Sequence, residues 1–167
     1  LALKPDGLFI AACFGGQTLH ELRRCLTEAE VAVTGGISPR VAPMAELRDL
    51  GGLIQRAGLA LPVADVVKLS VAYDDMFHLM RDLRAMGEGN ALTARLRRPT
   101  RRAVFDHAAD LYQQHFSTPD GKVLASFELV MLTGWAPSED QQKPLRPGSA
   151  KQRLADALDT NEHPLSH

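Results

Sequence analysis

The chain has 167 residues, of which 45% are hydrophobic and 23% are charged, which is enough for one soluble domain with one core. A formal net charge of −1 argues against a nucleic-acid-binding protein, which normally carries a clear basic excess. No apolar run is long enough to span a membrane. The two cysteines, Cys13 and Cys25, have no CxxC spacing and the histidines have no partner set, so we expect reduced thiols, no metal site and a cytoplasmic setting.

The first predicted element is a strand at Leu8–Phe14, between a turn at residues 4–7 and a pair of glycines. Proline and glycine favour the turn, because proline fixes φ and glycine accepts a positive φ. The run itself contains almost no polar residue, which is typical of a strand covered on both faces, as in a parallel sheet. We therefore expect it to be an interior strand of a larger sheet.

A helix is predicted over residues 17–33, because apolar residues recur there every three or four positions, namely Leu19, Leu22, Leu26 and Ala29. Thr18 followed by Glu21 predicts a capping box at its start, and the next glycine pair predicts its end. A second helix is predicted over residues 44–58, with an inward face formed by Leu47, Leu50, Leu53 and Ile54.

The rest of the chain is predicted to form, in order, one or two strands in 59–73, a helix in 74–87 capped by Asp74, a basic loop that begins at 90, a helix in 102–116 and a strand in 123–137. Helices and strands alternate, so the predicted fold class is α/β. We expect one domain part at 1–137, with a helical segment at about 74–117. A polar and loosely held tail is expected at 138–167.

Two blocks of this sequence resemble the second half of a class I S-adenosylmethionine-dependent methyltransferase. The block LKPDGLFIAACFGG is similar to the turn that leads into the fifth strand of that family, with Asp6 as a departure. The block LGGLIQRAGLALPVADVVKLSVAY is similar to the helix before the sixth strand, with Leu59 as a departure.

Further segments resemble one branch of the family. That branch contains the malonyl-acyl-carrier-protein methyltransferases of biotin synthesis and a mitochondrial complex I assembly factor that acts as a protein-arginine hydroxylase. The segments are TLHELRRCL, ISPRVAPMAELRDLGGLIQRAG, YDDMFHLMRDLRAMGEGN and SFELVMLTGWAP. The runs GGISP, MGEGN and, in the tail, KP followed by RPGSA look closer to the hydroxylase group and its bacterial relatives.

The resemblance implies the C-terminal part of a Rossmann-like, seven-stranded methyltransferase sheet, with a helical insert before the last strand that acts as a lid. A missing N-terminal half would supply four strands and most of the site for S-adenosyl-L-methionine. The glycine-rich motif of such a site does not occur here, and Gly15 and Gly16 do not replace it. We therefore expect this chain alone to be inactive and to bind no cofactor.

The function implied is S-adenosylmethionine-dependent methyl transfer to a protein side chain or to a carrier-bound acyl group. Two alternatives stay open on the same fold: protein-arginine hydroxylation, and a non-catalytic role in respiratory complex I assembly. The expected partners are a substrate protein or an acyl carrier protein, and a second copy of the chain through the exposed edge of the sheet. The expected location is the bacterial cytoplasm, or the surface of the inner membrane.

Four candidate substrate-binding residues lie near the first strand. Phe14 and Gly15 lie at its carboxyl end, where the resemblance implies the floor of a substrate pocket; a plain strand-to-helix turn is the alternative. His20 and Arg23 lie at the start of the next helix, where the resemblance implies a role in holding a carboxylate or a target side chain. For Arg23 the alternative is a solvated helix charge.

Two further candidates lie around the helical segment. Tyr73 closes the strand region and precedes Asp74 and Asp75, which suit either acid–base chemistry or helix capping. Arg101 belongs to a basic cluster that suits either docking of an acidic carrier protein or a solvated loop: Arg95, Arg97, Arg98, Arg101 and Arg102. The methionines of the intervening helix suit either the core or a pocket for an acyl or peptide substrate: Met76, Met80 and Met86.

Overall fold

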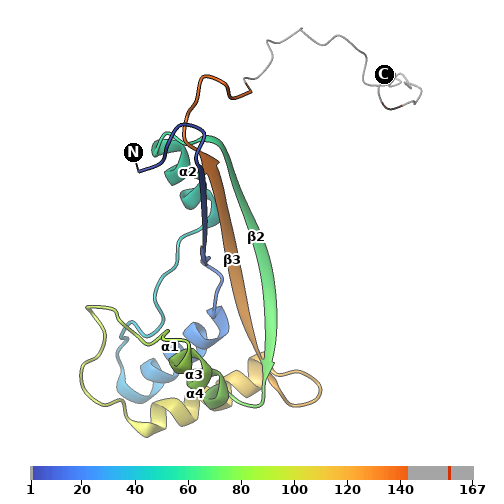
Figure 1. The fold of residues 1–167 in the computed structure, drawn as a ribbon. Helices are drawn as coiled ribbons and strands as arrows, with labels where there is room; N and C mark the ends of the chain where they lie inside the picture. The colour runs from blue at the N-terminus through green and yellow to red at the C-terminus, as the bar shows by residue number, and fades with distance from the viewer. Residues whose placement is uncertain (1, 143–157, 159–167) are drawn as a thin grey trace, which may run out of the picture. The chain divides into compact units, whose positions relative to one another are not determined.

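The computed structural model describes residues 2–142 and 158 of the chain (Figure 1). Its elements are, in order, β1 (Leu8–Phe14), α1 (His20–Thr34), α2 (Leu47–Arg56), β2 (Ala60–Tyr73), α3 (Met76–Ala85), α4 (Arg102–Phe116) and β3 (Val123–Trp135). All of them belong to one compact unit, Leu1–Pro137. The predicted α/β class is confirmed, whereas most of the predicted tail lies outside the described residues.

The described strands form one sheet in the order β1-β3-β2, and β3 pairs antiparallel with both neighbours. β1 and β2 therefore run parallel to each other on the two sides of β3. The predicted bounds of the first strand are confirmed, whereas its parallel neighbours, which the resemblance places in a missing N-terminal half, stay a prediction. Within the described residues β1 has its partner on one side, and that partner, β3, runs in the opposite direction.

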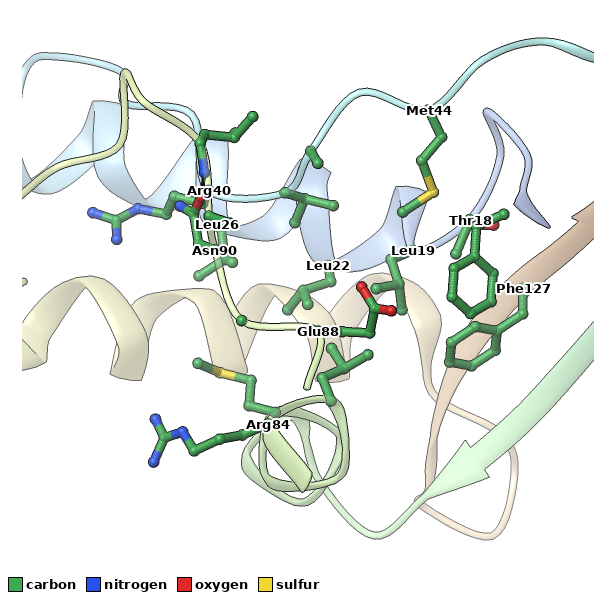
Figure 2. A pocket seen from close by; sticks show the side chains of 18 of the residues that line it. Thr18, Leu19, Leu22, Leu26, Arg40, Met44, Arg84, Glu88, Asn90 and Phe127 are labelled. Carbon is green, nitrogen blue, oxygen red and sulfur yellow. Dashed lines mark hydrogen bonds between the residues drawn. The ribbon is translucent and has the colours of Figure 1, made fainter. Parts of the chain in front are cut away.

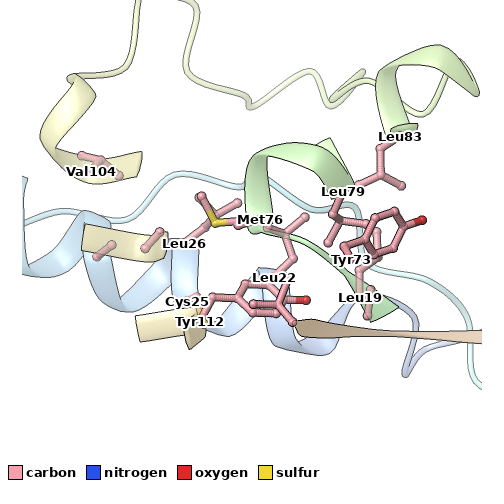
Figure 3. Close-up of a cluster of buried hydrophobic side chains, with 14 of the residues drawn as sticks. Leu19, Leu22, Cys25, Leu26, Tyr73, Met76, Leu79, Leu83, Val104 and Tyr112 are labelled. Carbon is pink, nitrogen blue, oxygen red and sulfur yellow. The ribbon is translucent and has the colours of Figure 1, made fainter. Parts of the chain in front are cut away.

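The two faces of the sheet are covered by different helices. α2 covers one face, where Ile54 packs with Val130 and Leu132 of β3. The odd-numbered residues of β3 point to the opposite face because successive side chains alternate along a strand. At the start of β3 these residues enter a second cluster with α1, α3 and α4, which Figure 3 shows and which includes Leu22, Met76, Leu79, Val104, Tyr112 and Ala125.

Part of this second face is apolar and uncovered. Leu8 is 51% exposed and Ile10 is 62% exposed, and Met131 beside them on β3 is also exposed. Their neighbours on β2, Val63 and Val67, are exposed as well. The prediction that the first strand is covered on both faces is therefore wrong within the described residues. A contiguous apolar surface of this kind marks a face that another element or molecule covers.

The helix ends differ from the predicted capping pattern. α1 begins at His20, after Leu19 in a left-handed conformation with φ of 53°, and no side chain caps it. The Thr18 hydroxyl instead donates to the Glu128 carbonyl and accepts from the Glu128 amide. α3 is capped by Asp75 rather than by Asp74, because the Asp75 carboxylate accepts from the amide of His78.

The packing of the core predicts that alanine substitutions at two leucines have different effects on stability. Leu79 is fully buried, whereas Leu53 on α2, which was expected to face inward, is 51% exposed. We expect Leu79→Ala to lower the free energy of unfolding by about 2–5 kcal/mol, because it leaves a cavity. Leu53→Ala removes the same atoms from the surface and should cost less than about 1 kcal/mol. Urea unfolding of both variants measures this, and equal losses would contradict the packing described.

Candidate functional site

A cavity of about 520 Å³ lies among the helices at the carboxyl end of β1. α1 forms one wall, and residues 40–44 together with residues 88–92 form the facing loops. Figure 2 shows its lining, which includes Phe14, Leu19, Leu22, Leu26, Arg40, Met44, Met80, Arg84, Glu88, Asn90, Phe105 and Phe127. Most of these side chains are apolar, so the cavity suits a ligand that has a hydrocarbon part.

The apolar side of the cavity follows from two local patterns. The leucines of α1 recur at three- and four-residue steps and so line one face of that helix. Phe14 ends β1, and its ring lies 6.1 Å from the ring of Phe127 on β3 between centroids, at an interplanar angle of 45°. This aromatic pair offers ring surface against which a planar or cationic group can stack.

A buried ion pair holds one wall of the cavity in place. The Arg40 guanidinium donates to the Glu30 carboxylate, at 2.7 Å from Nη2 to Oε1 and 3.0 Å from Nε to Oε2. The Ser38 amide and hydroxyl donate to the same carboxylate, and the Arg40 Nη1 donates to the Thr100 hydroxyl at 2.9 Å. These bonds tie α1 to the loop after it and to the residues before α4.

The ionisation of Glu30 depends on this network. Burial raises the pKa of its carboxyl group, but the hydrogen bonds from Arg40 and Ser38 together outweigh burial, and the pKa is lowered from its ordinary value. The ionised Glu30 carboxylate therefore forms an ion pair with the Arg40 guanidinium. Although Arg40 lines the cavity, its charge is already neutralised by the wall.

Two glutamate carboxylates lie against the two glycines of the turn after β1. Glu128 is only 6% exposed, and its carboxylate lies against Gly15, so closely that a side chain at Gly15 would overlap it. The exposed carboxylate of Glu46 lies in the same way against Gly16. Glycine is required at residue 15 for a packing reason, because a buried neighbour occupies the space of a β-carbon.

A smaller cavity of about 260 Å³ lies beside this turn. It is lined by Gln17, His20, Lys68, Leu69, Ser70, Ser126, Phe127 and Glu128. The His20 Nδ1 lies 3.1 Å from the carbonyl oxygen of Gln17 and 3.4 Å from the carboxylate of the buried Glu21. Glu21 itself accepts hydrogen bonds from the amide and hydroxyl of Ser126, so its function is to fasten α1 to β3.

The candidate residues suggested by the sequence lie in different places in the structure. Phe14 lines the large cavity, and His20 lines the small one. Arg23 donates to the backbone carbonyls of Thr18 and Ala42, which fixes the loop over α1. Tyr73 is buried in the core, where burial raises its pKa. Arg101 is exposed as the N-cap residue of α4 and does not line either cavity.

The three methionines of the helical segment also lie in different environments. Met76 is buried in the core, Met80 lines the large cavity, and Met86 is exposed. Among the described residues there is no group of three or more histidine, cysteine, aspartate or glutamate side chains suited to a metal ion. Both cysteines are free, and burial raises the pKa of Cys25 to about 11, as expected for an unreactive thiol inside the core.

The space beside Gly15 and Gly16 differs from that of a glycine turn that binds a cofactor such as S-adenosyl-L-methionine. A glycine turn that holds such a cofactor leaves room for the ligand to approach the backbone. Here the room at Gly15 and Gly16 is taken by Glu128 and Glu46. No helix in the described part of the chain is long and apolar enough to cross a membrane.

Several residues of the large cavity were not singled out from the sequence. Arg40, Met44 and Glu88 lie in loops, where no periodic pattern marks a function. The run MGEGN, which contains Glu88, was noted only as a family-like segment. The sequence did mark Glu128, because it is the one charged residue of β3, and a charge in a mainly apolar strand needs a specific environment.

The chain is homologous to known enzymes of the methyltransferase branch that its sequence resembles, which confirms the resemblance. The chain is 41% identical over 160 residues to arginine-hydroxylase NDUFAF5, mitochondrial, of Dictyostelium discoideum; the match covers 95% of this chain. It is 42% identical over 151 residues to the protein of the same name in Homo sapiens, a match that covers 89% of this chain.

A second group of relatives carries a different name. The chain is 33% identical over 139 residues to the malonyl-acyl-carrier-protein O-methyltransferase of Xylella fastidiosa (strain M23), and that match covers 83% of this chain. No protein-family model matches. The chain spans less than half of each of these relatives: 36% of the Dictyostelium protein, 43% of the human protein and 45% of the Xylella protein.

The glycine turn predicts different outcomes for two neighbouring alanine substitutions. A β-carbon at residue 15 would overlap the buried Glu128 carboxylate and lie 2.9 Å from Cγ2 of Val130. We expect Gly15→Ala to lower the free energy of unfolding by about 1–3 kcal/mol through overpacking. Gly16→Ala is the matched control, because the exposed Glu46 side chain can move away. Thermal unfolding of both variants measures this, and a Gly15→Ala protein as stable as the control would contradict it.

The buried ion pair predicts a stability difference that depends on pH. Because the pKa of Glu30 is lower in the folded state, its charge stabilises the fold above its ordinary pKa of 4.5, and this contribution is lost as pH falls below that value. We expect Glu30→Gln to destabilise the protein at pH 7 by on the order of 3 kcal/mol. The difference from the unsubstituted protein should shrink toward pH 4 and below.

The control for this prediction is Glu28→Gln on the same helix. Glu28 forms an exposed ion pair with Arg24, at 2.8 Å between Oε1 and Nε. Exposed pairs contribute little to stability, so this variant should stay close to the unsubstituted protein at every pH. Denaturant titrations at pH 7, 5 and 4 give the comparison. A loss for Glu30→Gln that does not change with pH would show that the carboxylate charge is not what stabilises the wall.

Proposed function

We propose that this chain forms the substrate-binding part of an enzyme that modifies a protein side chain. The observation that carries the proposal is the position of the large cavity, since Phe14, the last residue of β1, lines it. α/β proteins with doubly wound sheets bind their ligands beyond the carboxyl ends of the strands. In this proposal Phe14 and Gly15 form the floor beside the substrate, and α3 and α4 form the lid over it.

The reaction we propose is hydroxylation of an arginine side chain. In support, the relatives named arginine-hydroxylase are 41% and 42% identical over 95% and 89% of the chain. The methyltransferase relative is 33% identical over 83% of it. The cavity itself has the apolar lining that suits the three-methylene stem of an arginine side chain.

Methyl transfer to a protein side chain or to a carrier-bound acyl group is the second candidate, and one observation favours it. Five arginines gather between residues 95 and 102, and all five are exposed. A basic surface of this kind attracts an acidic carrier protein by electrostatic steering. In this alternative the apolar cavity would hold the acyl chain, and His20 and Arg23 would lie on the side of α1 nearest the turn.

The proposed enzyme is longer than this chain. Within residues 2–142 β1 pairs on one side only, and its other edge and the apolar face around Ile10 suit four further strands of a seven-stranded sheet, which would also carry most of the site for S-adenosyl-L-methionine. The chain alone would then be inactive, and its exposed edge would favour pairing with a second copy. We place the enzyme in the bacterial cytoplasm or at the inner membrane surface, where a substrate subunit of complex I would be assembled.

Mass spectrometry of arginine-containing proteins after expression of the full-length enzyme tests the reaction. Hydroxylation adds about 16 Da to an arginine and methylation adds about 14 Da to its acceptor, so the product mass identifies the reaction class. We expect the 16 Da product. A 14 Da product would favour the second candidate. Unchanged proteins and carriers, together with normal complex I assembly, would instead favour a non-catalytic assembly factor.

A further inference from the structure

Glu88 is the carboxylate among the lining residues of the large cavity, and its backbone is held firmly. It follows α3, where Gly87 adopts a left-handed φ of 85° and lets the chain turn back. The Glu88 amide then donates to the Leu83 carbonyl at 2.9 Å, and the Gly87 amide donates to the Arg84 carbonyl at 3.1 Å. This pair of bonds is the Schellman motif, which fixes the residue after the helix.

The far end of this loop is fixed as well. The Asn90 side-chain amide donates to the Pro39 carbonyl at 2.9 Å, which joins the loop to the wall held by Glu30 and Arg40. Glu88 is therefore presented from a segment anchored on both sides. The backbone that carries Glu88 therefore loses little conformational freedom when the side chain binds a ligand.

The charge of Glu88 is available to a ligand. Figure 2 shows its side chain extending toward α1, whereas the Arg84 side chain extends away from it. No cationic side chain among the described residues forms an ion pair with Glu88, and the other cation of the lining, Arg40, is bound to Glu30. The cavity therefore combines apolar walls, an aromatic pair and one free carboxylate.

This combination matches an arginine side chain part by part. The methylene stem fits the leucines of α1, and the flat cationic guanidinium suits both the rings of Phe14 and Phe127 and a carboxylate that accepts two parallel hydrogen bonds. Glu88 is exposed, so beside a neutral head group its carboxylate would stay bound to water, and an anionic head group would be repelled by it. The same carboxylate thus disfavours a malonyl group in this position.

We propose that Glu88 binds the guanidinium of the substrate arginine and selects for it. The inference rests on the proposed function, because that function supplies an arginine substrate. It assigns the MGEGN run a role: Gly87 sets the turn, Glu88 contacts the substrate and Asn90 anchors the loop.

The test compares two capped peptides that differ only in the head group of one side chain. The full-length protein is titrated with acetyl-Gly-Gly-Arg-Gly-Gly amide and with the same peptide carrying citrulline, the neutral analogue of arginine. We expect about 10- to 100-fold tighter binding of the arginine peptide, because a hydrogen-bonded charge pair is lost with citrulline. In Glu88→Gln this preference should fall to within about twofold, by the same argument.

Two matched variants separate a direct contact from a general effect. Asp110→Asn removes one negative charge from an exposed position on α4 outside the cavity and should keep the arginine preference. Glu88→Asp retains the charge on a shorter side chain and should recover part of it. If Glu88→Gln keeps the full preference, or if the unsubstituted protein shows none, the proposal is wrong.

The outcome also distinguishes this inference from the proposed reaction. An arginine preference that depends on Glu88, without a 16 Da product on any arginine, supports the binding role and contradicts hydroxylation. A 16 Da product that forms equally well in Glu88→Gln, with an unchanged Michaelis constant, supports hydroxylation and contradicts the binding role. Circular dichroism of each variant confirms that the comparison is made between folded proteins.

Discussion

The double pairing of β3 is the constraint on which this structure depends. Along Leu129–Trp135 the strand bonds to β1 on one side and to β2 on the other, so these residues fix the register of all three strands. Because side chains alternate, Val130 and Leu132 point to α2 whereas Phe127 points to the helical core. A slip of one residue would exchange these two faces, and Phe127 would no longer lie beside Phe14 at the cavity.

The helices and strands were largely predictable because their signals are local. The apolar run at Leu8–Phe14 and the helix at Arg102–Phe116 have the predicted bounds. The pairing direction was not predictable, because an apolar run shows that a strand is buried but not which strand lies beside it. The start of α1 was misread for a related reason: Thr18 and Glu21 have the residues of a capping box, but β3 offers them better partners in the folded chain.

The candidate site was predictable only where it touches regular structure. Phe14 could be found because it ends a strand, and strand ends are where α/β proteins place their ligands. Glu88 and Arg40 come from loops that meet only after α1, α3 and α4 have packed, so no sequence spacing brings them together. Tyr73 shows the opposite error, since its place at a strand end suggested a site whereas its ring fills the core.

The chemistry of the cavity follows from how its charges are distributed. Glu30 neutralises Arg40 inside the wall, where an unpaired guanidinium would be costly. Polar side chains around the cavity donate to backbone carbonyls of the loops: Arg23 of α1 donates to Ala42, and Asn90 donates to Pro39. The polar groups of the wall are thus bonded to one another and to the backbone. In the proposed function Glu88 remains as the charged group that contacts the substrate.

The left-handed turn at Leu19 has a consequence for motion. The Leu19 amide, which opens α1, donates to the Ser126 carbonyl of β3 at 2.7 Å, and the Gly15 amide donates to the Glu128 carbonyl at 2.7 Å. These bonds join the first turn of α1 to the sheet, so we expect the two to open and to exchange their amide hydrogens together. We therefore expect the amides of Gly15 and Leu19 at the floor of the cavity to be among the most protected against hydrogen exchange.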